Sequence, residues 1–201
     1  LLDLDLPTEY APSATIFVNL AERQAQAQPD AREPVLTVGH PQYASSPDAP
    51  PQDLANQLAT RSRYSIRGGS LAPLPFTAWE TDWVRDVFGD AGIAATQLKG
   101  DQATKAAVLS QGMGRRILHL ACHGLVDQGY GNLFGALALT PGSHPDDSAD
   151  DGFLTVAEIY GLRLTDCELT ILSACDTNVG PEQRGEGVWA LSRGFLVAGA
   201  R

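Results

Sequence analysis

The sequence contains few cysteines and few basic residues, and both shortages exclude classes of protein. Its three cysteines, Cys122, Cys167 and Cys175, follow no regular spacing, whereas a disulfide framework needs an even, patterned set. We therefore expect free thiols in a reducing, cytoplasmic compartment. The 14 lysines and arginines are outnumbered by 24 aspartates and glutamates, for a formal net charge of −10. Because such a chain repels a phosphate backbone, we expect no direct nucleic-acid partner.

Long apolar runs and internal repeats are also missing. The run at residues 195–200 is short and is broken by Gly199, so no segment has the length of a membrane span. The first six residues alternate apolar with acidic and lack the basic start of a signal peptide. Hydrophobic residues nevertheless make up 43% of the 201 residues, which is enough to bury a core. We expect one domain over residues 1–201 and no membrane partner.

Strand patterns and helix patterns alternate along the chain. Hydrophobic periodicity predicts helices over 13–27, 77–88, 101–110, 155–160 and 187–198, and strands over 34–39, 94–98, 116–121, 134–139 and 168–174. Three stretches rich in Gly, Pro or Asp, at 39–53, 68–75 and 141–152, predict surface loops. The alternation and the apolar strands predict an α/β fold, with a mostly parallel central sheet flanked by helices on both faces.

The two strongest predicted strands both end in residues that can carry chemistry. The strand at 116–121 leads into Cys122, His123 and Gly124, and the strand at 168–174 leads into Cys175 and Asp176. Parallel strands bring their carboxyl ends to one edge of the sheet. There His123 can take the proton of the Cys175 thiol and later protonate a leaving amine. The backbone N–H groups of Gly124 and Cys175 can stabilise a tetrahedral oxyanion, which completes an acyl-transfer site.

Several segments resemble, in the same order, those of the CHAT family of caspase-like peptidase domains. Residues 117–124 (ILHLACHG) resemble its histidine motif, and residues 171–178 (ILSACDTN), followed by 184–187 (RGEG), resemble its cysteine motif. Further matches are residues 10–15 (YAPSAT), 152–155 (GFLT), 157–159 (AEI) and 192–201 (SRGFLVAGAR). The ordered set covers nearly the whole chain and is far more specific than a lone His-Gly pair.

The resemblance implies a caspase-like sandwich and a cysteine endopeptidase without metal or cofactor, in which His123 and Cys175 form the catalytic dyad. It implies a protein or peptide substrate, and tetratricopeptide repeats or another regulatory domain in the same polypeptide. In such domains the residue two positions before the nucleophile lines the pocket for the substrate side chain that precedes the cut. Here this residue is Ser173, which is small and uncharged and so indicates no preference for a charged substrate residue. Asp176 either favours a basic substrate residue or orients a loop, and we favour the loop. Since another strand usually follows residue 201, we expect a truncated C-terminal end.

The alternative to an enzyme is a catalytically silent scaffold that keeps the fold and binds a partner protein. A third hypothesis is a peptidase held inactive until another domain or a partner releases it. The substrate, the activation signal and the oligomeric state are not readable from the residues.

Other conspicuous residues receive structural interpretations. We expect His119 to be a hydrogen-bonded histidine of the core, and Cys122 and Cys167 to be buried. Consecutive strand residues point to opposite faces, so we do not expect His119, Cys122 and His123 to bind a metal. The acidic run at 146–151 is expected to be a solvated loop. The helical spacing of Trp79, Trp83, Val84, Val87 and Phe88 predicts that they face the core together.

Overall fold

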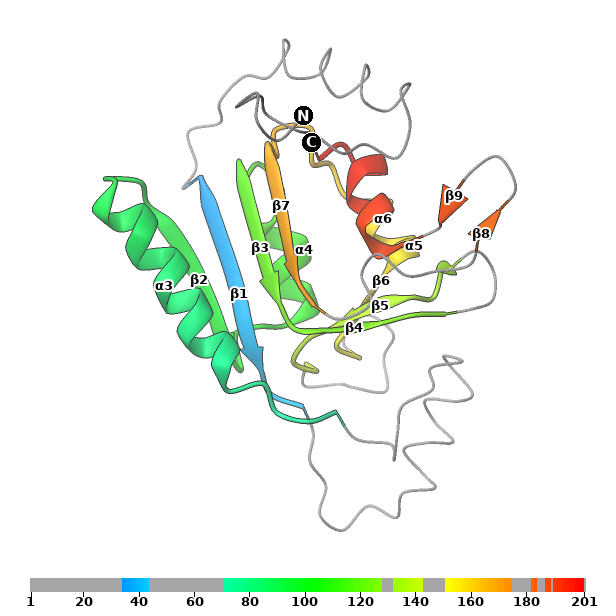
Figure 1. Ribbon diagram of the computed structural model, residues 1–201, viewed down its shortest axis with the longest axis horizontal. Helices are drawn as coiled ribbons and strands as arrows, with labels where there is room; N and C mark the ends of the chain where they lie inside the picture. The colour runs from blue at the N-terminus through cyan, green and yellow to red at the C-terminus, as the bar shows by residue number, and fades with distance from the viewer. Residues whose placement is uncertain are drawn as a thin grey trace, which may run out of the picture.

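The computed structural model of the chain describes residues 34–43, 71–127, 132–142, 151–174, 182–183, 187–188 and 190–200 (Figure 1). The helix expected over 13–27 therefore lies outside the described residues, as do most of the loop at 39–53 and the acidic residues 146–150. Within the described part, no helix is long and apolar enough to cross a membrane.

A central sheet of four parallel strands confirms the predicted α/β class. Its order is β2 (Ala95–Gly100), β1 (Val35–Pro41), β3 (Ile117–Ala121) and β7 (Leu169–Ser173). The four strands are closely level, because Val35 pairs with both Ala95 and Ile117, and Ile117 pairs with Leu169. The carboxyl ends of β1, β3 and β7 consequently meet at one edge of the sheet, as the sequence predicted.

Helices cover both faces of this sheet, and the two faces differ in chemistry (Figure 1). The face toward α4 (Lys105–Gln111) is aliphatic and forms the main core with the helix residue Val108. Its strand residues are Leu36, Val38, Leu98, Leu118 and Leu120. The opposite face, toward α3 (Phe76–Asp90), carries Thr37 and His119 from the alternate strand positions. Side chains alternate between the faces of a strand, so one set of strands supplies an apolar layer and a more polar one.

Helix α3 lies against β1 at a very short distance, and a glycine makes this possible. A Cβ atom added to Gly39 would lie 2.5 Å from Thr81 Cγ2 and 2.8 Å from the Thr77 carbonyl oxygen. The two threonines are the buried residues of the helix. Thr77 also accepts a hydrogen bond from the His40 N–H at 2.8 Å and donates one to the Leu74 carbonyl at 2.7 Å. Helix α3 is thus fixed to the sheet through small polar side chains.

This contact contradicts the inward face predicted for α3. Trp79 and Trp83 are 71% and 70% exposed, and Val87 is exposed as well. Of the five residues expected in the core, only Val84 and Phe88 are partly buried. The threonines of the helix face the sheet because α3 approaches Gly39 so closely that even an added Cβ would clash there, which leaves no room for a larger side chain.

A second sheet continues from the end of β3. It contains β4 (His123–Leu125), β5 (Ala136–Ala138) and β6 (Phe153–Thr155), paired antiparallel in that order. The capping box of Thr155 and Glu158 starts the short helix α5 (Val156–Ile159). Helix α6 (Leu191–Val197) begins later than the predicted 187, because Gly187–Val188 forms strand β9 against β8 (Glu182–Gln183). Phe195 and Leu191 of α6 join the main core.

A buried ion pair joins α4 to the segment around β6 and α5. The Lys105 side chain is only 2% exposed, and its ammonium lies 2.9 Å from both Asp151 Oδ1 and Glu158 Oε1. Burial by itself would lower the pKa of Lys105, but the hydrogen bonds to the two carboxylates leave this pKa above its ordinary value. The lysine therefore stays charged, and it connects α4 to the β6–α5 segment, which follows it by more than 40 residues in the sequence.

Replacement of Lys105 by Met should lower the free energy of unfolding by about 3 kcal/mol, because it leaves Asp151 and Glu158 without their cation. Urea denaturation measures this change. The matched control is Arg116→Ala, which breaks an exposed ion pair with Glu168 and should cost less than about 1 kcal/mol. Equal losses in the two variants would contradict the structural role assigned to Lys105.

Candidate active site

The candidate site lies where β3 passes from the parallel sheet into the antiparallel one. Ala121 pairs with Ser173 in the last register of β3 and β7, and the Cys122 N–H donates to the Ser173 carbonyl at 3.3 Å. His123 follows at once as the first residue of β4. Strand β3, which leads into His123, and strand β7, which leads toward residue 175, are therefore hydrogen-bonded neighbours up to their ends.

The imidazole of His123 is held by a backbone carbonyl. Its Nε2 atom lies 2.9 Å from the carbonyl oxygen of Ala72, in the segment just before α3. A carbonyl oxygen can only accept a hydrogen bond, so Nε2 carries the proton and donates. In the neutral ring, Nδ1 is then the unprotonated nitrogen, which is the form that a general base requires.

Tyr43 holds the other side of His123. The ring centroids of the two residues are 5.3 Å apart, with planes tilted by 42°. The Tyr43 hydroxyl accepts a hydrogen bond from the His123 N–H at 3.3 Å and donates one to the Ala138 carbonyl at 3.1 Å. Burial, with a smaller contribution from Cys122, raises the pKa of Tyr43 above its ordinary value. The phenol therefore stays protonated and ties the start of β4 to β5.

Strand β1 directs Tyr43 to this position. The pairing of β1 with β2 shifts between Gly39 and Pro41, and His40 has a positive φ of 52°. The Gln42 N–H then donates to Thr140 Oγ1 at 2.9 Å, which anchors the outgoing chain next to β5. The irregular end of β1 thus turns the chain across the edge of the sheet, toward His123.

The remaining predicted site residues divide into those that the structure describes and those that it does not. Gly124 lies in β4, paired with Leu137, and is half-buried. Ser173 ends β7 and is also half-buried. Cys175 and Asp176 lie outside the described residues, so the predicted dyad and oxyanion site remain predictions. Ala174, the last described residue before Cys175, packs against the main core.

The other two cysteines are buried, as the sequence predicted, and this makes them unsuited to nucleophilic chemistry. Cys122 is buried, and this burial raises the pKa of its thiol to about 12. Cys167 is also buried, and burial raises its pKa despite hydrogen bonds to Thr170 and to backbone. A thiol must ionise to attack, so neither can compete with an accessible cysteine at neutral pH.

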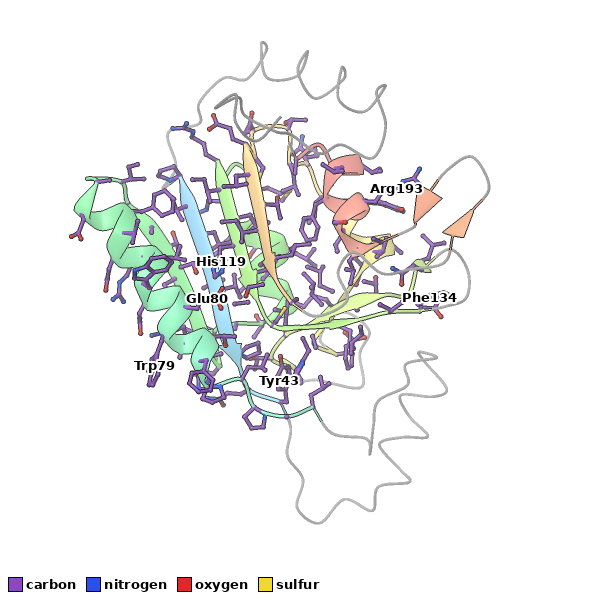
Figure 2. The ribbon with its side chains drawn as sticks, viewed as in Figure 1. Tyr43, Trp79, Glu80, His119, Phe134 and Arg193 are labelled. Carbon is purple, nitrogen blue, oxygen red and sulfur yellow. The ribbon has the colours of Figure 1, made fainter. Side chains whose placement is uncertain are left out.

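His119 is the hydrogen-bonded core histidine that the sequence predicted. It is 1% exposed. Its Nδ1 lies 2.8 Å from Thr37 Oγ1, and its Nε2 lies 3.0 Å from Glu80 Oε1 of α3. Figure 2 shows His119 and Glu80 between the sheet and α3. Over the described residues, no group of three or more His, Cys, Asp or Glu side chains is arranged to hold a metal ion.

Sequence reasoning missed two contributors to the site. Tyr43 lies in a segment interpreted as loop, and its only signal is its position just after the end of β1. Ala72 contributes a backbone carbonyl, so its side chain carries no signal at all. Both contacts depend on how segments far apart in the chain meet in space.

Replacement of Tyr43 by Phe should lower the free energy of unfolding by about 1–2 kcal/mol, because the part-buried His123 N–H and the Ala138 carbonyl lose their shared partner. Hydrogen exchange should also become faster at the His123 amide. Tyr160→Phe, at the end of α5, is the matched control and should leave exchange at His123 unchanged. Unaltered protection of this amide in Tyr43→Phe would rule out the role given to the hydroxyl.

Comparison with protein families supports the assignment made from the motifs. The model of the CHAT domain matches residues 5–201, which is nearly the whole chain and includes every candidate site residue. No curated protein matches the chain at a significant level. The chain thus belongs to the CHAT domain family, which is related to caspase-like peptidases.

Proposed function

We propose that this domain is a cysteine endopeptidase in which His123 and Cys175 form the catalytic dyad. The observation that carries the proposal is the hydrogen bond from His123 Nε2 to the Ala72 carbonyl. It leaves Nδ1 as the basic nitrogen at the edge where β3 and β7 end. Cys175 follows Ser173 by two residues, as His123 follows Ala121, and Ala121 and Ser173 are paired. In the proposal, the segment after β7 brings Cys175 to this edge, where it meets the imidazole of His123.

The reaction would proceed in two halves. His123 Nδ1 takes the proton of the Cys175 thiol, and the thiolate attacks the carbonyl carbon of the scissile peptide bond. The N–H groups of Gly124 and Cys175 donate to the oxyanion of the tetrahedral intermediate. The imidazolium then protonates the leaving amine, the C–N bond breaks, and a thioester remains on Cys175. In the second half, Nδ1 takes a proton from water, the resulting hydroxide attacks the thioester, and the thiol and a carboxylic acid are released.

Residue 173 gives the substrate pocket of this proposal no charge preference. Ser173, at the half-buried end of β7, is small, and in our proposal it lines the pocket for the side chain before the cut. Asp176 would shape the adjacent loop through backbone hydrogen bonds. The substrate in this proposal is a protein or a peptide, and regulation by tetratricopeptide repeats or another domain of the same polypeptide is part of it. Both features rest on the family resemblance.

Peptide acyloxymethyl ketones that differ in the residue before the cut should label the full-length protein at Cys175 alone, as located by peptide mass spectrometry. Cys122 and Cys167 serve as internal controls, because burial raises the pKa of both thiols. Since general acid–base catalysis contributes about 10²–10⁴-fold, His123→Ala should slow labelling by about that factor. His40→Asn is the matched histidine control: Asn tolerates the positive φ at this position, and labelling should be unchanged.

Two results would count against the peptidase. Labelling of Cys175 that is equally fast in His123→Ala would separate the cysteine from its assigned base. Substrate cleavage that persists in Cys175→Ala would exclude this cysteine as the nucleophile. If Cys175 resists even small alkylating reagents, the silent scaffold becomes the better description.

A further inference from the structure

The outer side of α3 carries a continuous apolar surface that the proposed peptidase chemistry does not use. It consists of Phe76, Trp79, Trp83 and Val87, which we call the α3 stripe. Their relative exposures are 72%, 71%, 70% and 48%. The four residues are separated by three, four and four positions, so they share one side of the helix over about three turns. Figure 2 shows Trp79 directed away from the sheet.

The α3 stripe has the composition of a binding surface rather than that of a solvated helix. Solitary exposed apolar residues are common, but contiguous patches of several hundred Å² mark interaction sites. Tryptophan is also among the residues that contribute most to interfaces. Phe76 and Trp79 contact each other edge to face, with ring centroids 5.5 Å apart. The opposite side of α3 is already occupied by its contact with β1, through Thr77 and Thr81.

Acidic side chains line one edge of the α3 stripe. Asp82, Asp86 and Asp90 recur every four residues, so they form a row beside the two tryptophans. Arg85 and Lys99 contact Asp82, and Arg85 also contacts Asp86. The hydrogen bond from Lys99 lowers the pKa of Asp82, which keeps that carboxylate charged. The row retains a net negative charge, and each carboxylate can accept more hydrogen bonds than those it receives.

The charge along this edge indicates which occupant fits. In a symmetric antiparallel pairing of two α3 helices, equivalent edges would meet, and the aspartate rows of both copies would face each other. Such like-charge contacts are unfavourable. A helix with lysine or arginine beside its apolar residues would instead meet the row with opposite charge. Apolar spacing of three and four on both helices also permits regular helix–helix packing.

We propose that the α3 stripe is a docking surface for an amphipathic helix of a partner, with basic residues flanking its apolar side. The apolar residues of the partner cover Trp79 and Trp83, and its basic residues pair with Asp86 and Asp90. This inference does not depend on the proposed catalytic function, because no residue of the stripe contacts His123.

The test uses the full chain and two synthetic helical peptides of 18 residues with a dye at one end. Both peptides carry leucines at helical spacing; one has lysines beside them and its control has glutamates. Fluorescence anisotropy should show that the basic peptide binds and that the acidic peptide binds about 10-fold more weakly. The difference in affinity between the two peptides should become smaller at high salt. Trp83→Ala should lower the affinity for the basic peptide by about 30-fold or more, as expected for a residue that contributes strongly to an interface.

Two variants of the chain make the result specific. Val197→Ala removes an exposed apolar residue of α6 and should leave binding unchanged. The double variant Asp86→Lys with Asp90→Lys should reverse the preference toward the acidic peptide. Circular dichroism verifies that each variant is folded.

Three results would overturn the proposal. One is equal affinity for the two peptides, or no binding up to about 1 mM. Another is self-association that light scattering detects and that Trp83→Ala abolishes, since the occupant would then be a second copy. The third is protection of Trp79 and Trp83 from oxidative footprinting in the free chain, since another part of the same chain would then cover them.

Discussion

The level register of β1, β3 and β7 is the constraint on which the candidate site depends. Because the strands are parallel and start at matched residues, their ends reach the same edge of the sheet. Each end then supplies a different component. The end of β1 leads to Tyr43, the end of β3 to His123, and the end of β7 to the segment that contains Cys175. A slip of one residue in any pair would turn these side chains to the other face.

The position of His123 depends on contacts with residues that are far away in the sequence. The Ala72 carbonyl sets the proton on Nε2, and the Tyr43 hydroxyl holds the backbone N–H of the same residue. These two groups come from the segments that follow β1 and precede α3. The position of His123 therefore depends on where these two segments lie, and both adjoin the contact of α3 with β1 at Gly39.

The sequence predicted the features that local patterns determine. Apolar strands such as residues 117–121 and their His and Cys endings indicated the sheet, the family and the edge that carries the site. The helical period of α3 was also recognised, but not which side faces inward. Which side of α3 faces inward depends on the surface of the sheet beneath it, where Gly39 and Thr37 of β1 and His119 of β3 lie. Tyr43 and the Ala72 carbonyl were missed for the same reason, since only tertiary structure brings them to His123.

Helix α3 lies between the two surfaces for which we propose a function. Its first residue, Phe76, belongs to the α3 stripe and lies four positions after Ala72, whose carbonyl holds His123. Thr77, the next residue, bonds to Leu74 and to His40, which fixes the segment between them. The start of the α3 stripe and the segment that orients the imidazole are therefore held by neighbouring hydrogen bonds. Because α3 packs against β1 without a gap at Gly39, the helix has little room to shift relative to the strand that leads to Tyr43.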